Sequence, residues 1–127
     1  MPMVGGEAAV SWRVMGTAAQ VVACLRAAAR RAGLALELGP DQAQEGALCG
    51  WAYAGNGTGT PIGRMDVAEV RLSPGPGAGT TVELRRVDGH VPSRFEKQLQ
   101  HAEMKFRRPL MWSTFVVAAR RLTAVAA

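Results

Sequence analysis

The residues with the clearest chemistry are the basic side chains in the stretch TTVELRRVDGHVPSRFEKQLQHAEMKFRRP, residues 80–109. Five of them follow at intervals that place them on one side of a helix: Arg94, Lys97, His101, Lys105 and Arg108. An apolar stripe lies next to them, formed by Phe95, Leu99, Ala102 and Phe106. A basic stripe beside an apolar one is typical of helices that bind anionic surfaces. The alternative is a solvated face on which Glu–Lys and Glu–Arg pairs form within the helix.

The net charge of the 127-residue chain is +5, and it is unevenly distributed. Residues 1–63 contain four basic and four acidic side chains, whereas residues 64–127 contain eleven basic and six acidic ones. This asymmetry predicts that the C-terminal half binds an anionic partner. The candidates are a membrane surface, a nucleic acid and an acidic protein face.

Catalytic and cofactor-binding patterns are scarce in the sequence. The glycine-rich stretch GNGTGTPIG, residues 55–63, lacks the lysine of a phosphate-binding loop and leads into a strand, which favours a plain connector. His90 and His101 have no partner at metal-ligand spacing, and no Ser/His/Asp arrangement is evident. Cys24 and Cys49 are expected to be buried thiols rather than a disulfide or a metal pair. We therefore expect no enzyme, no metal and no cofactor.

The periodicity of apolar residues predicts an α+β fold. Strands are expected over residues 8–14, 34–38, 47–54, 64–72 and 80–87, and helices over residues 18–33 and 92–108, with a further helix from Leu110. The expected architecture is an antiparallel sheet of four to five strands with two helices on one face, in the order β-α-β-β-β-β-α. Residues 8–108 would form the domain, and residues 109–127 a helical extension. No apolar run is long enough to span a membrane and no secretory leader opens the chain, so an intracellular protein is expected.

Several local features refine this prediction. Thr17 is a candidate N-cap and Gly33 a candidate C-terminal stop for the first helix. The apolar phase of the strand at residues 64–72 switches between Val67 and Ala68, which predicts a β-bulge or burial on both faces. Trp112 and Phe115 are expected to pack over the sheet, the alternative being an interfacial aromatic edge.

The order of these segments resembles the kinase-associated 1 domain, the C-terminal regulatory module of MARK-type and related serine/threonine kinases. The resemblance covers residues 8–108 and rests on five segments: VSWRV, AAQVVACLRAAARRAGLALEL, ALCGWAY, MDVAEVRL and VELRRVDGHVPSRFEKQLQHAEMKF. The chain departs from the family pattern in its longer glycine- and proline-rich loops, in Glu69 at an expected apolar position, and in the tail after Pro109.

The resemblance implies a non-catalytic regulatory domain that binds acidic phospholipids and holds a kinase catalytic domain in an inhibited state. It places the domain in the cytoplasm, peripheral at the inner face of the plasma membrane. The lipid-binding residues that it implies are Arg85, Arg86, Arg94, Lys97, Lys105, Arg107 and Arg108. Arg26, Arg30 and Arg31 would extend this patch if the two helices lie side by side.

Two other classes of function remain open at the level of the sequence. A nucleic-acid-binding domain would need exposed aromatic residues for stacking, and Trp51 and Tyr53, on one face of a strand, are the pair available. A protein–protein interaction module would use a sheet edge or the apolar tail LMWSTFVVAARRLTAVAA, residues 110–127, to dock on a partner such as a kinase domain.

Overall fold

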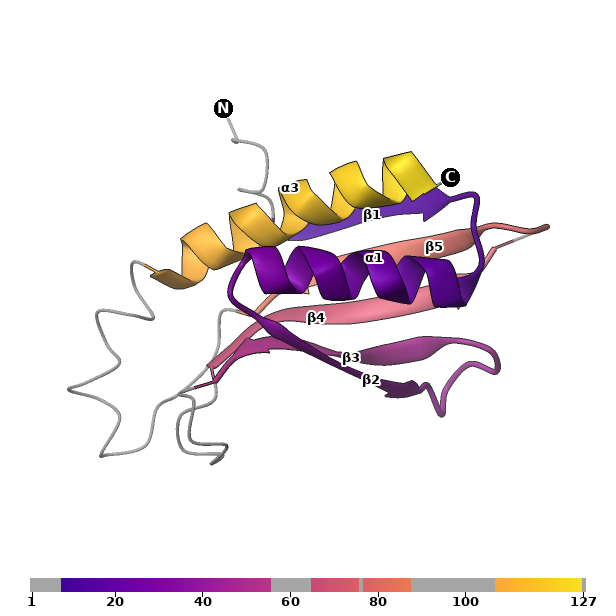
Figure 1. Cartoon of the computed structure of the whole chain (residues 1–127). Coiled ribbons are helices and arrows are strands. Elements are labelled where there is room, and N and C mark those ends of the chain that lie inside the picture. The colour runs from indigo at the N-terminus through magenta and orange to yellow at the C-terminus, as the bar shows by residue number, and fades with distance from the viewer. Residues whose placement is uncertain (1–7, 56–64, 76, 88–106, 127) are drawn as a thin grey trace.

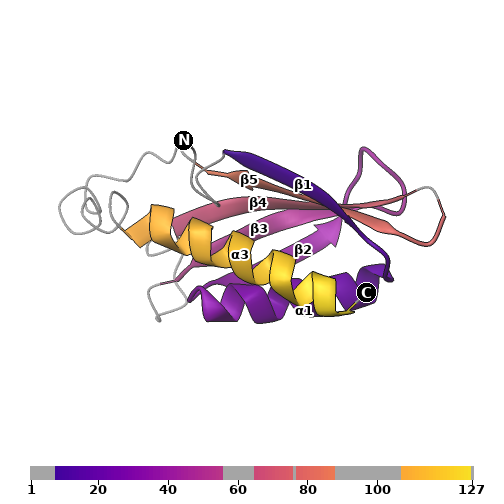
Figure 2. The same ribbon diagram turned by 90° about the horizontal axis from the view of Figure 1, so that it is seen from above.

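The computed structural model describes residues 8–55, 65–75, 77–87 and 107–126. The elements, in chain order, are β1 (Ala9–Val14), α1 (Ala18–Arg31), β2 (Ala35–Pro40), β3 (Leu48–Ala54), β4 (Met65–Pro74), β5 (Thr80–Arg86) and α3 (Arg108–Ala126). The five strands form one antiparallel sheet in the order β1-β5-β4-β3-β2, and both helices cover the same face of it (Figures 1 and 2). The predicted α+β architecture is confirmed.

The first helix begins and ends where the sequence predicts. The Thr17 side chain accepts a hydrogen bond from the Gln20 backbone N–H at 3.2 Å, and the Gln20 side chain accepts one from the Thr17 N–H at 2.9 Å. This reciprocal pair satisfies two N–H groups that the first turn leaves unpaired. Gly33, at φ +75°, follows the last turn in the left-handed conformation that glycine adopts without strain.

The C-terminal segment completes the core. Trp112, Phe115 and Val116 are fully buried, and α3 runs alongside α1 over the sheet (Figure 2). The packing role predicted for Trp112 and Phe115 is therefore confirmed. The helix α3, whose residues were expected to form an extension, contributes Trp112, Phe115 and Val116 to the same hydrophobic core as the strands before it. The helix expected over residues 92–108 lies outside the described residues, apart from its last two.

The predicted irregularity in β4 is a β-bulge. Ala68 pairs with Ala52 on β3, whereas Asp66 pairs with Tyr53, so Val67 is an extra residue in the ladder. Both Val67 and Ala68 are fully buried. The bulge thus explains how the apolar phase changes along a single strand.

Candidate anion-binding face

The outer surface of the two helices carries the excess positive charge of the chain. Among the described residues of α1 and α3, five arginines are exposed: Arg26, Arg30, Arg31, Arg120 and Arg121. We call these residues and the helix surface around them the arginine face. Neither helix contains an acidic residue. The remainder of the chain has ten basic and ten acidic side chains, so these five arginines equal the whole net charge of +5.

A groove between the helices lies at the centre of this face. Arg31 of α1 and Arg121 of α3 line it, and its volume is about 320 Å³. Its other lining residues, all from α3, are Ser113, Thr114, Val117 and Ala118. The side chains of Arg30, Arg31 and Arg121 form no hydrogen bond or ion pair with other described residues. Each of these guanidinium groups can therefore use all of its donors on a ligand.

The other two arginines of the face are partly engaged at its margins. Arg26 donates from Nη1 to the carbonyl oxygen of Leu36 at 3.2 Å and so contacts the edge strand β2. Arg120 lies over the indole ring of Trp12, with the guanidinium carbon 5.3 Å from the ring centroid. The Trp12 indole in turn donates to Thr123 Oγ1 at 3.0 Å, which links β1 to α3. These contacts fix where the two charges lie.

Apolar side chains of α3 are exposed close to these charges. Leu110 is 67% exposed, Val117 40% and Val125 82%. On α1 the exposed positions in the turns before Arg26 include the small residues Ala19 and Ala23. The arginine face therefore combines cationic groups with exposed apolar side chains, and neither helix adds a carboxylate to it. This combination is found in helices that bind membrane interfaces.

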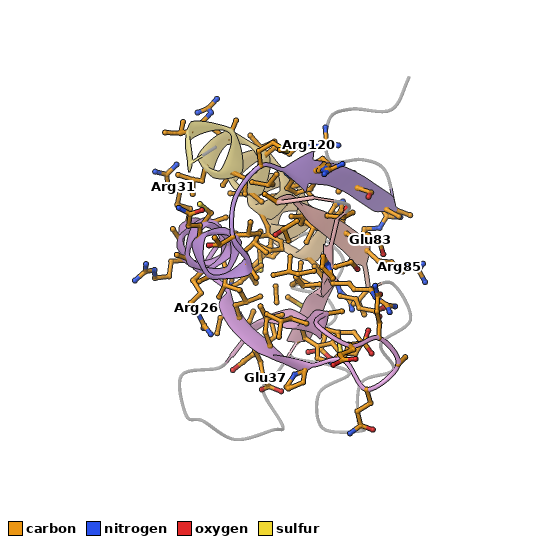
Figure 3. The ribbon with its side chains drawn as sticks, turned by 90° about the vertical axis from the view of Figure 1, so that its right-hand side faces the viewer. Arg26, Arg31, Glu37, Glu83, Arg85 and Arg120 are labelled. Atoms are coloured by element: carbon orange, nitrogen blue, oxygen red, sulfur yellow. The ribbon has the colours of Figure 1, made fainter. Side chains whose placement is uncertain are left out.

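The structure divides the predicted binding residues between different surfaces. Arg26 and Arg30 lie on the arginine face, and Arg107 is exposed immediately before α3. Arg85 lies on the opposite, uncovered face of the sheet, and Figure 3 shows it on the other side of the strands from Arg26 and Arg31. Arg86, the next residue along β5, is half-buried and lies on the helix side of the sheet. The prediction that one patch contains Arg85 together with Arg26 and Arg30 is therefore wrong, because the sheet separates these residues.

Arg108 was expected on an exposed stripe, and this expectation is wrong. Its side chain is only 7% exposed. Its Nε and Nη2 atoms donate to the backbone carbonyl oxygen of Asp66 at 3.0 and 2.6 Å. Asp66 immediately precedes the bulge in β4, where the regular ladder is interrupted, and Arg108 supplies two donors to its part-buried carbonyl. Arg108 joins the start of α3 to the sheet and is not available to a surface ligand.

Some predicted binding residues are not described by the structure, and two exposed arginines were not predicted. Arg94, Lys97 and Lys105 lie outside the described residues. Arg120 and Arg121 were not among the predicted binding residues, although both are exposed on α3. The sequence does contain a signal for them, since two consecutive arginines without a nearby acidic residue interrupt an otherwise apolar helix.

The uncovered face of the sheet has a balanced charge. Arg85 lies directly opposite Glu69 on the neighbouring strand, and Arg71 lies directly opposite Glu83. Arg71 also forms an ion pair with Asp41 at 2.7 Å. Opposite charges across neighbouring strands favour the pairing of the strands but leave little net field for a polyanion. The source of positive potential in the described part of the chain is therefore the helix layer.

Trp51 and Tyr53 do share the uncovered face, as predicted. The strand register places Trp51 between Glu37 on β2 and Glu69 on β4, and Tyr53 opposite Asp66. Carboxylates on both sides of the candidate stacking residue would repel the phosphates of a nucleic acid. This arrangement speaks against nucleic-acid binding through the sheet.

The described residues give further bounds on the site. No helix among them has the length and apolar character needed to cross a membrane. They contain no cluster of three or more His, Cys, Asp or Glu side chains with the geometry of a metal site. Cys24 and Cys49 are free and half-buried, the first on α1 and the second on the uncovered face of the sheet.

Comparisons with protein families, with curated proteins and with solved structures give no match.

Proposed function

We propose that this protein is a non-catalytic targeting domain that binds anionic phospholipid membranes through the arginine face. The observation that carries the proposal is the gathering of five exposed arginines on two adjacent helices that contain no acidic residue. A basic side chain near an anionic leaflet contributes about 1 kcal/mol, so five contribute about 5 kcal/mol. That corresponds to weak, reversible binding, which salt would weaken further.

The exposed side chains between the charges favour a membrane over other polyanions. Leu110, Val117 and Val125 are costly to expose to water, and they gain from contact with the boundary between headgroups and acyl chains. A nucleic acid offers no comparable apolar layer to these residues. Arginine also binds phosphate oxygens with two parallel hydrogen bonds, which suits phospholipid headgroups.

The regulatory part of the proposal comes from the resemblance in the order of strands and helices to the kinase-associated 1 domain. In such a module, membrane attachment would recruit a serine/threonine kinase and release its catalytic domain from an inhibitory contact. The basic face is the feature that supports this role, since the same surface would serve both contacts.

Vesicle co-sedimentation of the whole chain tests the proposal. Phosphatidylcholine vesicles are compared with phosphatidylserine-rich ones, each at about 50 and 500 mM salt. We expect binding to the anionic vesicles alone, and only at low salt. The variant Arg30→Ala/Arg31→Ala/Arg121→Ala should lose affinity by about 100-fold, because each guanidinium contributes about 1 kcal/mol.

The matched controls are single substitutions with the same change of charge on opposite faces. Arg121→Ala should weaken binding roughly fivefold, whereas Arg85→Ala should leave it within about twofold. Equal losses for the two variants would show that only net charge matters and would contradict a specific face. An acidic protein as the true partner would appear as an absence of binding to either type of vesicle.

A further inference from the structure

The two edges of the sheet differ in how well they are protected. Because the strand order is β1-β5-β4-β3-β2, β1 and β2 each have one side without a partner strand in the described part of the chain. On β2, Arg26 donates to the carbonyl oxygen of Leu36 at 3.2 Å, and the strand ends in Pro40, which has no N–H group. Charged side chains and proline keep an edge strand from pairing with another chain. The edge at β2 is therefore protected.

The edge at β1 lacks this protection. β1 contains no proline, and Arg13 is its only charged residue. The Arg13 side chain extends inward from the edge, since a Cβ atom at Gly79 would lie 2.6 Å from its Nε atom. Gly79 immediately precedes β5, which is the inner neighbour of β1. β1 thus places no charged side chain across its outer edge.

Two residues of β1 direct their backbone polar groups to this open edge. The Ala8 carbonyl oxygen accepts from the Arg86 N–H at 2.8 Å, and the pairing of β1 with β5 is regular along the whole strand. In an antiparallel pair, alternate residues bond to the same neighbouring strand. Ala9 and Ser11 therefore direct their N–H and C=O groups away from β5. Their side chains are small and exposed, and a hollow of about 370 Å³ opens beside them, so an approaching strand meets no bulky group.

We propose that β1 pairs antiparallel with β1 of a second copy of this chain, about a two-fold axis at Ser11. Ser11 then lies directly opposite Ser11 of the second copy, and the two residues exchange backbone hydrogen bonds. Val10 lies opposite Trp12 of the second copy, both on the helix side of the sheet, and a β-branched residue opposite an aromatic one favours pairing. Arg13 lies opposite Ala9, so no like charges of the two strands are directly opposite. The strand is thus complementary to itself.

Symmetry favours a second copy that uses the same strand. A contact from β1 to β2 of the next copy would leave the same two edges open and would build a filament. The Arg26 contact and Pro40 on β2 disfavour that arrangement. A contact from β1 to β1 closes after two copies, and its two-fold axis is perpendicular to the sheet, so both helix layers lie on one side. The two arginine faces then point in the same direction, although the dimer itself does not depend on membrane binding.

Arg120 makes this dimer sensitive to salt. In each copy its guanidinium carbon is 5.3 Å from the centroid of the Trp12 ring. The two Trp12 residues become diagonal neighbours across the axis, with Cα atoms about 7–8 Å apart. The two Arg120 side chains therefore approach one another, and salt screens their repulsion. Salt should strengthen the dimer, whereas it should weaken membrane binding, so the two proposals are tested separately.

Sedimentation velocity of the whole chain, without lipid, tests the proposal. The protein is measured from about 5 µM to 1 mM, because an interface of one short strand pair is small and corresponds to weak association. We expect a monomer–dimer equilibrium whose dissociation constant falls by about twofold or more between about 50 and 500 mM salt. A dimer that dissociates as salt is added would contradict the proposed register.

Two substitutions at Ser11 should weaken the dimer without affecting the fold. Ser11→Lys places two positive charges directly opposite one another at the axis and should raise the dissociation constant by about tenfold or more. Ser11→Pro removes the outward N–H group, keeps the hydrogen bonds to β5 and should also weaken the dimer. The matched control is Ser73→Lys on the inner strand β4, which should dimerise as the unmodified chain does. Circular dichroism checks that each variant is folded.

A mixture of two variants tests the position of the axis. Ser11→Lys and Ser11→Glu chains should each dimerise weakly alone and should form a heterodimer when mixed, because opposite charges then meet at the axis. Three outcomes would overturn the proposal: a monomer at every concentration, a Ser11→Lys variant that dimerises as the unmodified chain does, and a mixture that forms no heterodimer. An equal loss in Ser73→Lys would show that net charge controls the association and would also reject the β1 edge.

Discussion

Two consecutive arginines, Arg107 and Arg108, have opposite fates at the start of α3. The Arg107 side chain is exposed, whereas that of Arg108 is buried against the Asp66 carbonyl group. Because successive residues of a helix are about 100° apart around its axis, a basic pair at the edge of the buried side can have one side chain in water and the other in the core. The role of a charged residue at such a position is better predicted from nearby polar groups that need a hydrogen-bond partner than from its charge alone.

Arg108 should therefore matter for stability and not for membrane binding. We expect Arg108→Met, which keeps much of the aliphatic length, to lower the free energy of unfolding by about 1–3 kcal/mol, because it removes two hydrogen bonds to the part-buried carbonyl of Asp66. Urea denaturation checks this value. Arg121→Ala, on an exposed position of the same helix, should change the free energy of unfolding by less than about 0.5 kcal/mol. If Arg108→Met were neutral, the hydrogen bonds to Asp66 would have no net stabilising effect.

Among the helices and strands, the sequence predicted correctly those features that depend on interactions between residues close together in the chain. The cap at Thr17, the stop at Gly33 and the phase change in β4 each reflect constraints within a few residues. The arginine face was only partly predictable, since it joins α1 to α3 across about ninety residues. The apolar residues of α3 are distributed around the helix rather than along one stripe, so the sequence did not distinguish a packed helix from an extension.

The close approach of β2 to β3 is a second test at this scale. A Cβ atom at Gly50 would overlap the backbone carbonyl of Glu37, which has no flexible part that can move aside. We expect Gly50→Ala to destabilise the fold by about 1–3 kcal/mol, as overpacking does. Thermal unfolding followed by circular dichroism measures the effect.

Gly39 provides the matched control for Gly50 in the neighbouring strand. A Cβ atom at Gly39 would meet nothing within 4 Å, and its φ is not in the left-handed region. Gly39→Ala should therefore change the free energy of unfolding by less than about 0.5 kcal/mol. Similar losses in both variants would mean that strand propensity, and not the contact with Glu37, limits alanine in this region.

The described part of the molecule has two chemically different faces, which the sheet separates. The helix side carries an excess of arginine beside exposed apolar residues, whereas on the uncovered side Arg85 lies opposite Glu69 and Arg71 opposite Glu83. Figure 3 shows Arg26 and Arg31 on one side of the sheet and Arg85 and Glu83 on the other. An anionic surface would therefore bind the protein in one orientation, because only the helix side is attracted to it.

Two single-thiol variants test this orientation. One keeps only Cys49, on the uncovered sheet face, and the other carries Val117→Cys on α3 with Cys24 and Cys49 both changed to Ala. Anionic vesicles should slow the reaction of the Val117→Cys thiol with a water-soluble maleimide several-fold, because the arginine face covers it on binding. The Cys49 rate should stay the same, since its face remains in water. Slowing at Cys49 alone would place the sheet against the membrane and would reject the arginine face as the docking surface.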